Sequence, residues 1–216
     1  MKTKNKIVLL LIAIVLSVAT MLSGCATTVV QQGEKTTDTM QALENEGRQF
    51  LAQIDKTNAS LQAVIDPNPG DIKTATQAYI DNVNSIQGMA EKLGKRADSL
   101  KANKEAYFAE WEQTNKTYTN SQIRQLSTEQ KQEIHSRFNE ITDASVGLRD
   151  ATNAYLSNLQ DIKTYLQTVP ATQGIATISD HAQKTIQQGN TLKESFTPVL
   201  NLIAEVRGEI STTPQQ

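Results

Sequence analysis

From Met40 onward, apolar residues recur at alternating spacings of three and four positions almost to the end of the chain. This spacing places them in one narrow stripe along an α-helix, as in helices that pack in coiled-coil fashion. No stretch alternates apolar and polar residues with the period of two that a half-buried strand requires. The pattern therefore predicts an all-α protein. In the first segment the stripe consists of Met40, Leu43, Gly47, Phe50, Ile54, Thr57, Leu61 and Val64.

Three breaks divide the pattern into four helical segments. Residues 66–70 contain two prolines and a glycine, residues 120–126 interrupt the periodicity, and residues 170–174 form the last break. Proline and glycine stop helices because proline lacks a backbone donor and glycine favours other conformations. Short breaks between long helices predict antiparallel neighbours, and hence an elongated up-down-up-down four-helix bundle.

Local signals refine these helices. Ser127 and Gln130 read as a capping box at the start of the third helix. Pro198 lies inside the fourth segment and is expected to bend it.

The register predicts two core layers in which large and small residues alternate. Counting from the hairpins puts Tyr155 in one layer with Gly47, Ala90 and Gly189. A second layer sets Phe196 against small and aliphatic neighbours, and such packing would leave no ligand cavity. Those neighbours are Ala97, Leu148 and Met40.

The first 24 residues read as an export signal. Three lysines precede an apolar run from Ile7 to Ala19, which is shorter than the roughly 20 residues of a membrane-spanning helix. The chain has one cysteine, Cys25, directly after Leu22, Ser23 and Gly24. This ending resembles the bacterial lipobox. The resemblance implies cleavage before Cys25 and attachment of lipid (diacylglycerol and a fatty acid such as palmitate) to that residue.

The resemblance also implies a location. Ala26, rather than an aspartate, follows the cysteine, which in Gram-negative lipoproteins implies routing to the outer membrane, facing the periplasm. We therefore expect a signal peptide over residues 1–24, an acylated N-terminus and flexible tether over 25–36, a bundle over 37–211 and a disordered tail over 212–216.

The charge balance argues against one class of partner. The chain carries 21 basic and 23 acidic residues, and loss of the first 24 residues would remove three lysines and no acid. An acidic body is a poor match for nucleic acid, whose phosphates require a basic face.

Motifs for catalysis, cofactors and metals are missing from the sequence. His135 and His181 fall near the starts of the third and fourth helices, at opposite ends of an up-down bundle, so they are not expected to share a metal ion. Glu-x-x-His, HExxH, haem-attachment and glycine-rich phosphate motifs are absent. We therefore expect no enzyme activity, no cofactor and no metal.

Two further clusters leave alternatives open. Five basic residues in the second helix form either a solvated face or a contact for anionic lipid headgroups. Four aromatic residues near the second hairpin form either a core cluster or a binding surface for a partner or lipid. The basic residues are Lys92, Lys95, Arg96, Lys101 and Lys104, and the aromatic ones are Tyr107, Phe108, Trp111 and Phe138.

Three stretches, together with the lipobox, resemble a family of Gram-negative lipoproteins that is described only as a domain of unknown function. They are Glu105–Glu112, Ile123–Ser127 and Arg137–Ile141. The resemblance implies export and a helical body, and it supplies no activity.

These observations predict a lipid-anchored, non-enzymatic helical bundle that acts as a structural or interaction module of the cell envelope. Its partners would be the membrane, through Cys25, and an envelope protein that the sequence does not identify. The alternative is a carrier that holds lipid or another hydrophobic ligand in the bundle core.

Overall fold

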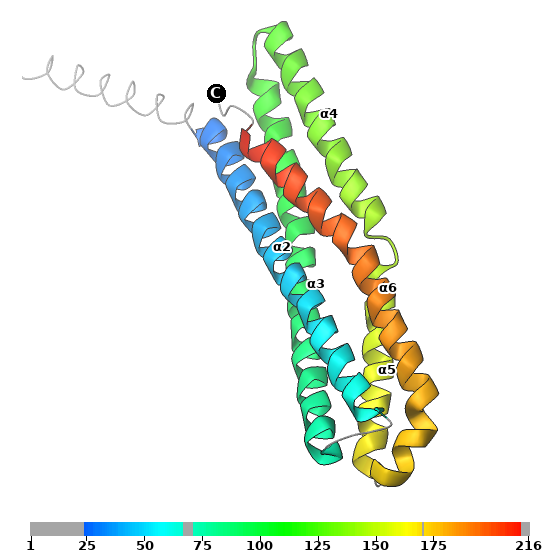
Figure 1. The fold of residues 1–216 in the computed structure, drawn as a ribbon. Helices are drawn as coiled ribbons and strands as arrows, with labels where there is room; N and C mark the ends of the chain where they lie inside the picture. Colours follow the sequence, from blue (N-terminus) through cyan, green and yellow to red (C-terminus); the bar gives the residue numbers. More distant parts are fainter. Residues whose placement is uncertain (1–23, 67–70, 170, 213–216) are drawn as a thin grey trace, which may run out of the picture.

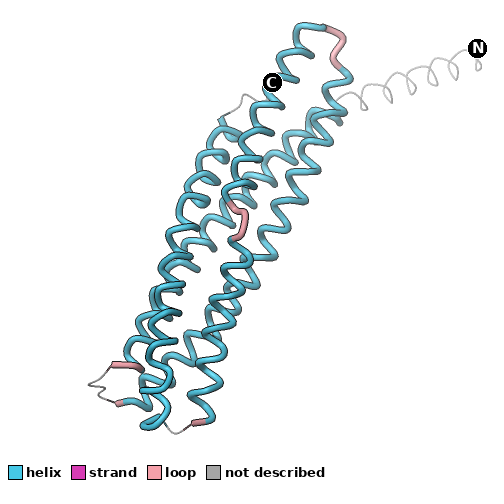
Figure 2. The backbone as a smooth tube through the Cα atoms, turned by 90° about the vertical axis from the view of Figure 1, so that its right-hand side faces the viewer, coloured by secondary structure: helices cyan, strands magenta, loops and turns pink. Residues whose placement is uncertain are grey.

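The computed structural model describes residues 24–66, 71–169 and 171–212. Over these residues the chain forms five α-helices and no strand. They are α2 (Gly24–Val64), α3 (Ile72–Thr117), α4 (Ser121–Ala144), α5 (Leu148–Thr168) and α6 (Ala171–Thr212). α2 and α3 run antiparallel, α4 and α5 follow one another back along α3, and α6 returns beside α2 (Figures 1 and 2). The predicted all-α antiparallel bundle is therefore confirmed.

The two ends of the bundle carry different connections. The α3–α4 connection lies at the end where α2 begins and α6 finishes (Figures 1 and 2). The chain passes from α2 to α3 and from α5 to α6 at the opposite end. This is the predicted arrangement, although residues 67–70 and 170 lie outside the described residues.

The core follows the predicted apolar stripes. Every residue of the stripe predicted for the first helix is buried, from Met40 to Val64. Burial of each large aliphatic or aromatic side chain contributes about 1.5–3 kcal/mol, which makes this face the main reason that α2 joins the bundle. The fully buried large side chains come from α2, α3, α5 and α6, among them Phe50, Tyr79, Tyr155 and Leu200.

The third predicted helix is in fact two helices. α4 ends at Ala144 and α5 begins at Leu148, with a turn over residues 145–147 that we call the elbow. Gly147 has a φ of 79°, in the left-handed region where a side chain would be strained. Ile141 and Leu148 are both buried, so the seven-residue apolar spacing continues across the elbow. That continuity is why the pattern predicted one helix.

The predicted start of the third helix was also wrong. α4 begins at Ser121, and the Asn120 side chain caps it by accepting hydrogen bonds from the backbone N–H groups of Gln122 and Ile123 at 2.9 and 3.3 Å. Ser127 therefore lies inside α4 rather than at a capping box. The helical structure of residues 121–126 is not visible in an apolar pattern because these residues are exposed.

The predicted flexible tether over residues 25–36 is helical in the structure. α2 extends back to Gly24, Thr36 is fully buried, and a methyl group added at Gly33 would lie 3.3 Å from the Tyr107 ring. Val29, Gly33 and Thr36 continue the three-four spacing of Met40 toward the N-terminus, although two of them are not apolar. Of the predicted signal peptide, residues 1–23 lie outside the described residues, as do residues 213–216 of the predicted tail.

The last helix is longer than predicted. α6 begins at Ala171, so residues 171–174 of the predicted break over 170–174 are helical, and residue 170 lies outside the described residues. The helix continues through Pro198 and curves as it crosses the bundle (Figure 1).

Candidate functional site

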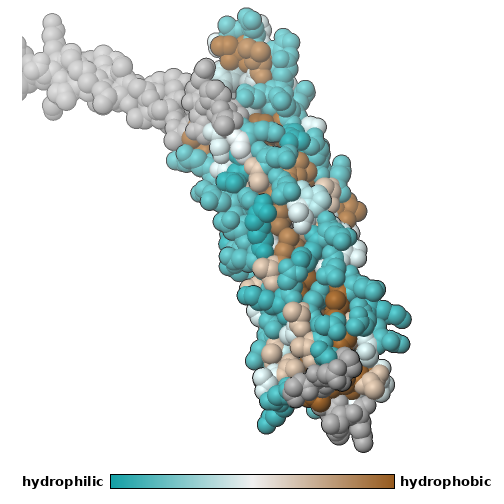
Figure 3. Space-filling view, viewed as in Figure 1, coloured by the Kyte–Doolittle hydropathy of each residue, from teal (hydrophilic) through white to brown (hydrophobic). Residues whose placement is uncertain are grey.

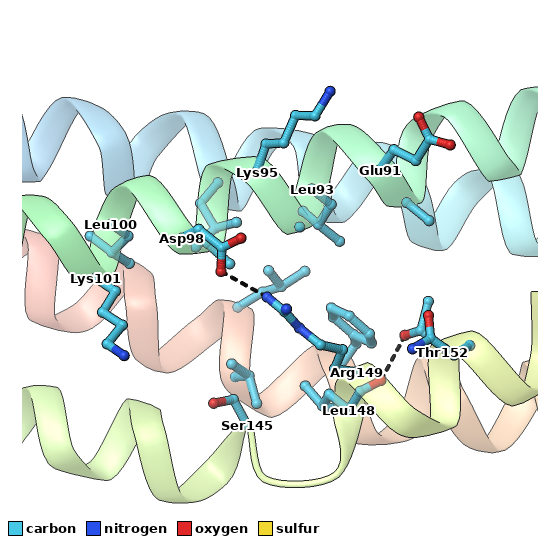
Figure 4. A pocket seen from close by; sticks show the side chains of 18 of the residues that line it. Glu91, Leu93, Lys95, Asp98, Leu100, Lys101, Ser145, Leu148, Arg149 and Thr152 are labelled. Carbon is cyan, nitrogen blue, oxygen red and sulfur yellow. Dashed lines mark hydrogen bonds and ion pairs between the residues drawn. The ribbon is translucent and has the colours of Figure 1, made fainter.

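A groove of about 1310 Å³ opens between α3 on one side and the α4–α5 elbow on the other. Its floor is apolar and comes chiefly from α6, with Phe196, Val199, Leu200 and Ile203. Leu93 and Leu100 of α3 and Leu148 of α5 line its walls (Figure 4). The volume exceeds the roughly 300–1,000 Å³ of ordinary small-molecule sites, so the groove suits a long ligand better than a compact one.

The rim of the groove carries charges of both signs. Arg149 reaches across from the first turn of α5 and pairs with Asp98 of α3 at 2.8 Å (Figure 4). Both side chains are about two-thirds exposed, at 68% and 67%, and exposed pairs of this kind are weak, so a ligand can displace the bridge. The other charged residues of the rim are Glu91, Lys95, Lys101, Lys104, Glu105 and Asp161.

The groove corrects the prediction that large and small residues would fill the core without a cavity. Ala97 is exposed, Ala90 is half-buried, and both line the groove together with Phe196 and Leu148. The Phe196 ring packs instead against Phe50, with ring centroids 5.7 Å apart. Ala97 is therefore left exposed and Ala90 half-buried on the α3 side of the groove, opposite the elbow.

The other predicted layer is correct in part. Tyr155 is 1% exposed, and a methyl group added at Gly189 would lie 2.9 Å from its ring. Gly47, however, faces Leu200 rather than Tyr155. The same part of the core holds Asn58, which the apolar pattern did not reveal.

Buried polar groups in the interior bind one helix to another. The Tyr155 hydroxyl donates to Asn58 Oδ1 at 2.8 Å, and Asn58 Nδ2 donates to the Ile186 carbonyl oxygen at 3.2 Å, which links α5, α2 and α6. The Tyr79 hydroxyl donates to the Leu159 carbonyl oxygen at 2.7 Å. Burial raises the pKa of both phenols well above the usual value, so both remain protonated donors. These polar groups stabilise the bundle through helix-to-helix hydrogen bonds.

The aromatic cluster belongs to the core. Tyr107, Trp111 and Phe138 are 5%, 8% and 2% exposed, whereas Phe108 is half-buried. The rings of Tyr107 and Trp111 are 5.4 Å apart in an edge-on arrangement, and Trp111 Nε1 donates to Ser127 Oγ at 2.9 Å. Burial raises the pKa of Tyr107 to about 12. The cluster joins α3 to α4, so the core alternative is confirmed.

The predicted basic stretch divides between two roles. Lys92 and Arg96 pair with Glu46 of α2 at 3.3 and 3.0 Å. Burial opposes ionisation of Glu46, but the hydrogen bonds from Arg96 and Lys92 outweigh it and lower the pKa of the carboxyl group. Lys95, Lys101 and Lys104 lie on the groove instead, with the Lys104 ammonium 5.7 Å from the centre of the Phe138 ring.

The two histidines lie apart on the surface. His135 is exposed on α4 beside the Phe108 ring at 5.1 Å, and His181 is exposed on α6. Over the described ranges, no three or more His, Cys, Asp or Glu side chains gather as a metal site would require.

The predicted lipid attachment residue, Cys25, lies in the first turn of α2, at the end of the bundle that carries the α3–α4 connection. Among the helices described, none is both long and apolar enough to cross a bilayer.

Comparison with known proteins gives a family but no activity. No curated protein and no solved structure matches the chain. A protein family described as "Protein of unknown function (DUF2959)" matches residues 27–204, which include α3, α4, α5 and most of α2 and α6. The chain therefore belongs to the DUF2959 family of proteins of unknown function.

Proposed function

We propose that this protein is a lipid-anchored, non-enzymatic module of the bacterial cell envelope, attached through Cys25 and facing the periplasm from the outer membrane. The observation that carries the proposal is the lipobox-like sequence at Cys25, immediately where a long helical bundle begins. With 41 residues at 1.5 Å each, α2 alone is about 60 Å long. An anchor at one end of such a rod would hold the other end well away from the membrane.

The anchor can be tested by replacing the acylated residue. Cys25→Ser should abolish incorporation of labelled fatty acid and leave the precursor uncut, because the sulfur that accepts the lipid is missing. Ser23→Ala is the matched control, since it keeps a small residue in the lipobox and should still be labelled and processed. Normal labelling and cleavage of Cys25→Ser would contradict the anchor.

The role as an interaction module depends on a partner at the distal end, where α2 passes to α3 and α5 passes to α6. Loops held by a rigid scaffold are frequent sites of binding. Cross-linking in intact cells should capture an envelope protein from this end, and replacement of residues 66–70 by a Gly/Ser linker should abolish that cross-link. Unchanged cross-links would move the partner site to the helix faces.

The groove favours a second candidate function, that of a lipid carrier. An apolar floor beneath a rim with both signs of charge matches a phospholipid, whose acyl chains would lie on α6 while its zwitterionic headgroup meets the rim. Burying the acyl chains would provide the driving force, at about 0.8 kcal/mol per CH₂. A ligand of this type is long enough to occupy a groove that runs along several helical turns.

A pair of alanines on α3 allows a matched test of this carrier function. Ala97 and Ala102 are both exposed, but Ala97 lines the groove and Ala102 does not. Native mass spectrometry of the purified protein should detect bound phospholipid, and Ala97→Phe should displace it by filling the groove. Ala102→Phe should leave the lipid bound. Absence of lipid from the native protein, or equal loss in both variants, would contradict the carrier function.

A further inference from the structure

The connection between α3 and α4, together with the first turn and a half of α4, forms a tip that projects beyond the described start of α2 (Figures 1 and 2). We define this tip as residues 116–126. It exposes Ile123 and Leu126 to solvent, at 48% and 58% of their surface. Figure 3 shows an apolar patch at this extremity of the molecule.

The apolar side chains of the tip share one face of α4. Ile123 and Leu126 are three residues apart, and such residues are neighbours on a helix surface. Tyr118, half-buried at the end of α3, adds an aromatic ring of the kind that favours a boundary between water and lipid. Single exposed apolar residues are common on protein surfaces, so Ile123 and Leu126 alone do not indicate a contact. The hydrogen bonds, the charge and the position of the tip also have to be considered.

Hydrogen bonds hold the tip in this conformation. The Asn120 side chain caps α4 directly before Ile123. Arg124 Nε donates to the Tyr118 carbonyl oxygen at 3.2 Å, and Asn115 Nδ2 donates to Thr128 Oγ1 at 2.8 Å. These hydrogen bonds fix the turn, so that Ile123 and Leu126 are held in positions exposed to solvent.

The charge of the tip is of one sign. Between Lys116 and Leu126 the sequence contains two basic residues, Lys116 and Arg124, and no acidic residue. Both side chains are exposed. The chain as a whole carries more acidic than basic residues, whereas this segment carries only basic ones. Anionic lipid headgroups attract such basic side chains.

The position of the tip indicates the kind of partner that it contacts. It lies at the same end of the bundle as Cys25, the residue proposed to carry the lipid. A surface patch with apolar residues, an aromatic ring and basic side chains, placed beside a lipid anchor, has the chemistry of an interfacial membrane contact.

We propose that the tip over residues 116–126 inserts Ile123 and Leu126 into the interfacial region of the membrane that holds the anchor, with Lys116 and Arg124 on its headgroups. The proposal rests on the proposed lipid anchor at Cys25. Two contacts at one end would fix the orientation of the bundle on the membrane, which a single point of attachment does not do.

The test uses the full lipidated protein reconstituted in vesicles of phosphatidylcholine with phosphatidylglycerol. A thiol-reactive, polarity-sensitive fluorophore is placed at Ile123→Cys, since acylation leaves Cys25 without a free thiol. Val146→Cys is the matched control, because Val146 is 78% exposed but lies at the elbow, far along the bundle from the tip. Circular dichroism verifies that both variants fold.

The fluorophore at position 123 should shift to shorter emission wavelengths and be quenched by spin-labelled lipid. The fluorophore at position 146 should keep the emission wavelength that it has in buffer and should not be quenched. Adding Leu126→Asp should reverse the shift at 123, and omitting phosphatidylglycerol should reduce it. Flotation with the vesicles, measured on the same samples, reports the Cys25 anchor separately. Flotation with equal emission at both positions would overturn the tip contact alone, while failure to float would overturn the anchor and the tip contact with it.

Discussion

Gly189 lies where α6 crosses the Tyr155 ring and the Asn58 amide. A methyl group at this position would be 2.7 Å from Asn58 Nδ2 and 2.9 Å from Tyr155 Cε2, distances at which atoms must move. Since Tyr155 and Asn58 are also hydrogen-bonded to each other, a displacement of one disturbs the other. Gly88 on α3 offers the opposite environment, because a methyl group there would have no neighbour within 4 Å.

These two glycines give a paired prediction. Gly189→Ala should destabilise the bundle by about 1–3 kcal/mol through overpacking of a buried contact. Gly88→Ala should stabilise it by roughly 0.5–1 kcal/mol, because alanine restricts the unfolded chain and fits an exposed helix. Urea denaturation followed by circular dichroism measures both changes. A stable Gly189→Ala variant would mean that α6 does not approach Tyr155 this closely in solution.

At the level of whole elements, the main difference from the predicted fold is that the third segment forms two helices, α4 and α5. The elbow and the adjoining turns of α4 and α5 form the side of the groove opposite the apolar wall of α3. At its N-terminal end, α4 is fixed by its Asn120 cap and by the hydrogen bond between Trp111 and Ser127. Ser127 therefore bonds α4 to α3, whereas the sequence pattern assigned it to the start of a helix.

The position of this cap can be tested directly. Asn120→Ala should cost about 0.5–2 kcal/mol, because two N–H groups at the start of α4 lose their acceptor. Ser136→Ala is the control, since Ser136 is exposed in the interior of α4 and should tolerate the change. Thermal unfolding compares the variants. An Asn120→Ala protein as stable as the control would place the start of the helix elsewhere.

For the whole molecule, the phenols buried in α3 and α5 are expected to make the bundle less stable at alkaline pH. Burial raises the pKa of Tyr107 to about 12, and it also raises that of Tyr79 and Tyr155. In the unfolded chain these phenols would titrate near 10. Above that pH the unfolded state loses protons that the folded state retains, so the free energy of unfolding falls as pH rises.

We therefore expect the thermal midpoint to be steady at neutral pH and to decrease from about pH 10 upward. Tyr107→Phe should make this decrease less steep, because one buried phenol no longer contributes. Circular dichroism melts across the alkaline range measure the midpoint, and absorbance near 295 nm follows tyrosine ionisation. An unchanged slope in Tyr107→Phe would show that its phenol is exposed to solvent.

The helical class, the antiparallel order and most of the buried face can be predicted from the amino-acid sequence alone. These follow from local physics, since residues such as Phe50, Ile54 and Leu61 repeat at the helical period and must be covered together. The elbow at Gly147, the N-terminal extension of α2 and the groove depend instead on how the helices pack in three dimensions. The apolar spacing continues from Ile141 to Leu148 across the elbow, and Thr36 is buried only because α3 covers it. Ala90 and Ala97 look like core residues in sequence, but they line a groove, because only the packing of α4, α5 and α6 decides which part of α3 is covered.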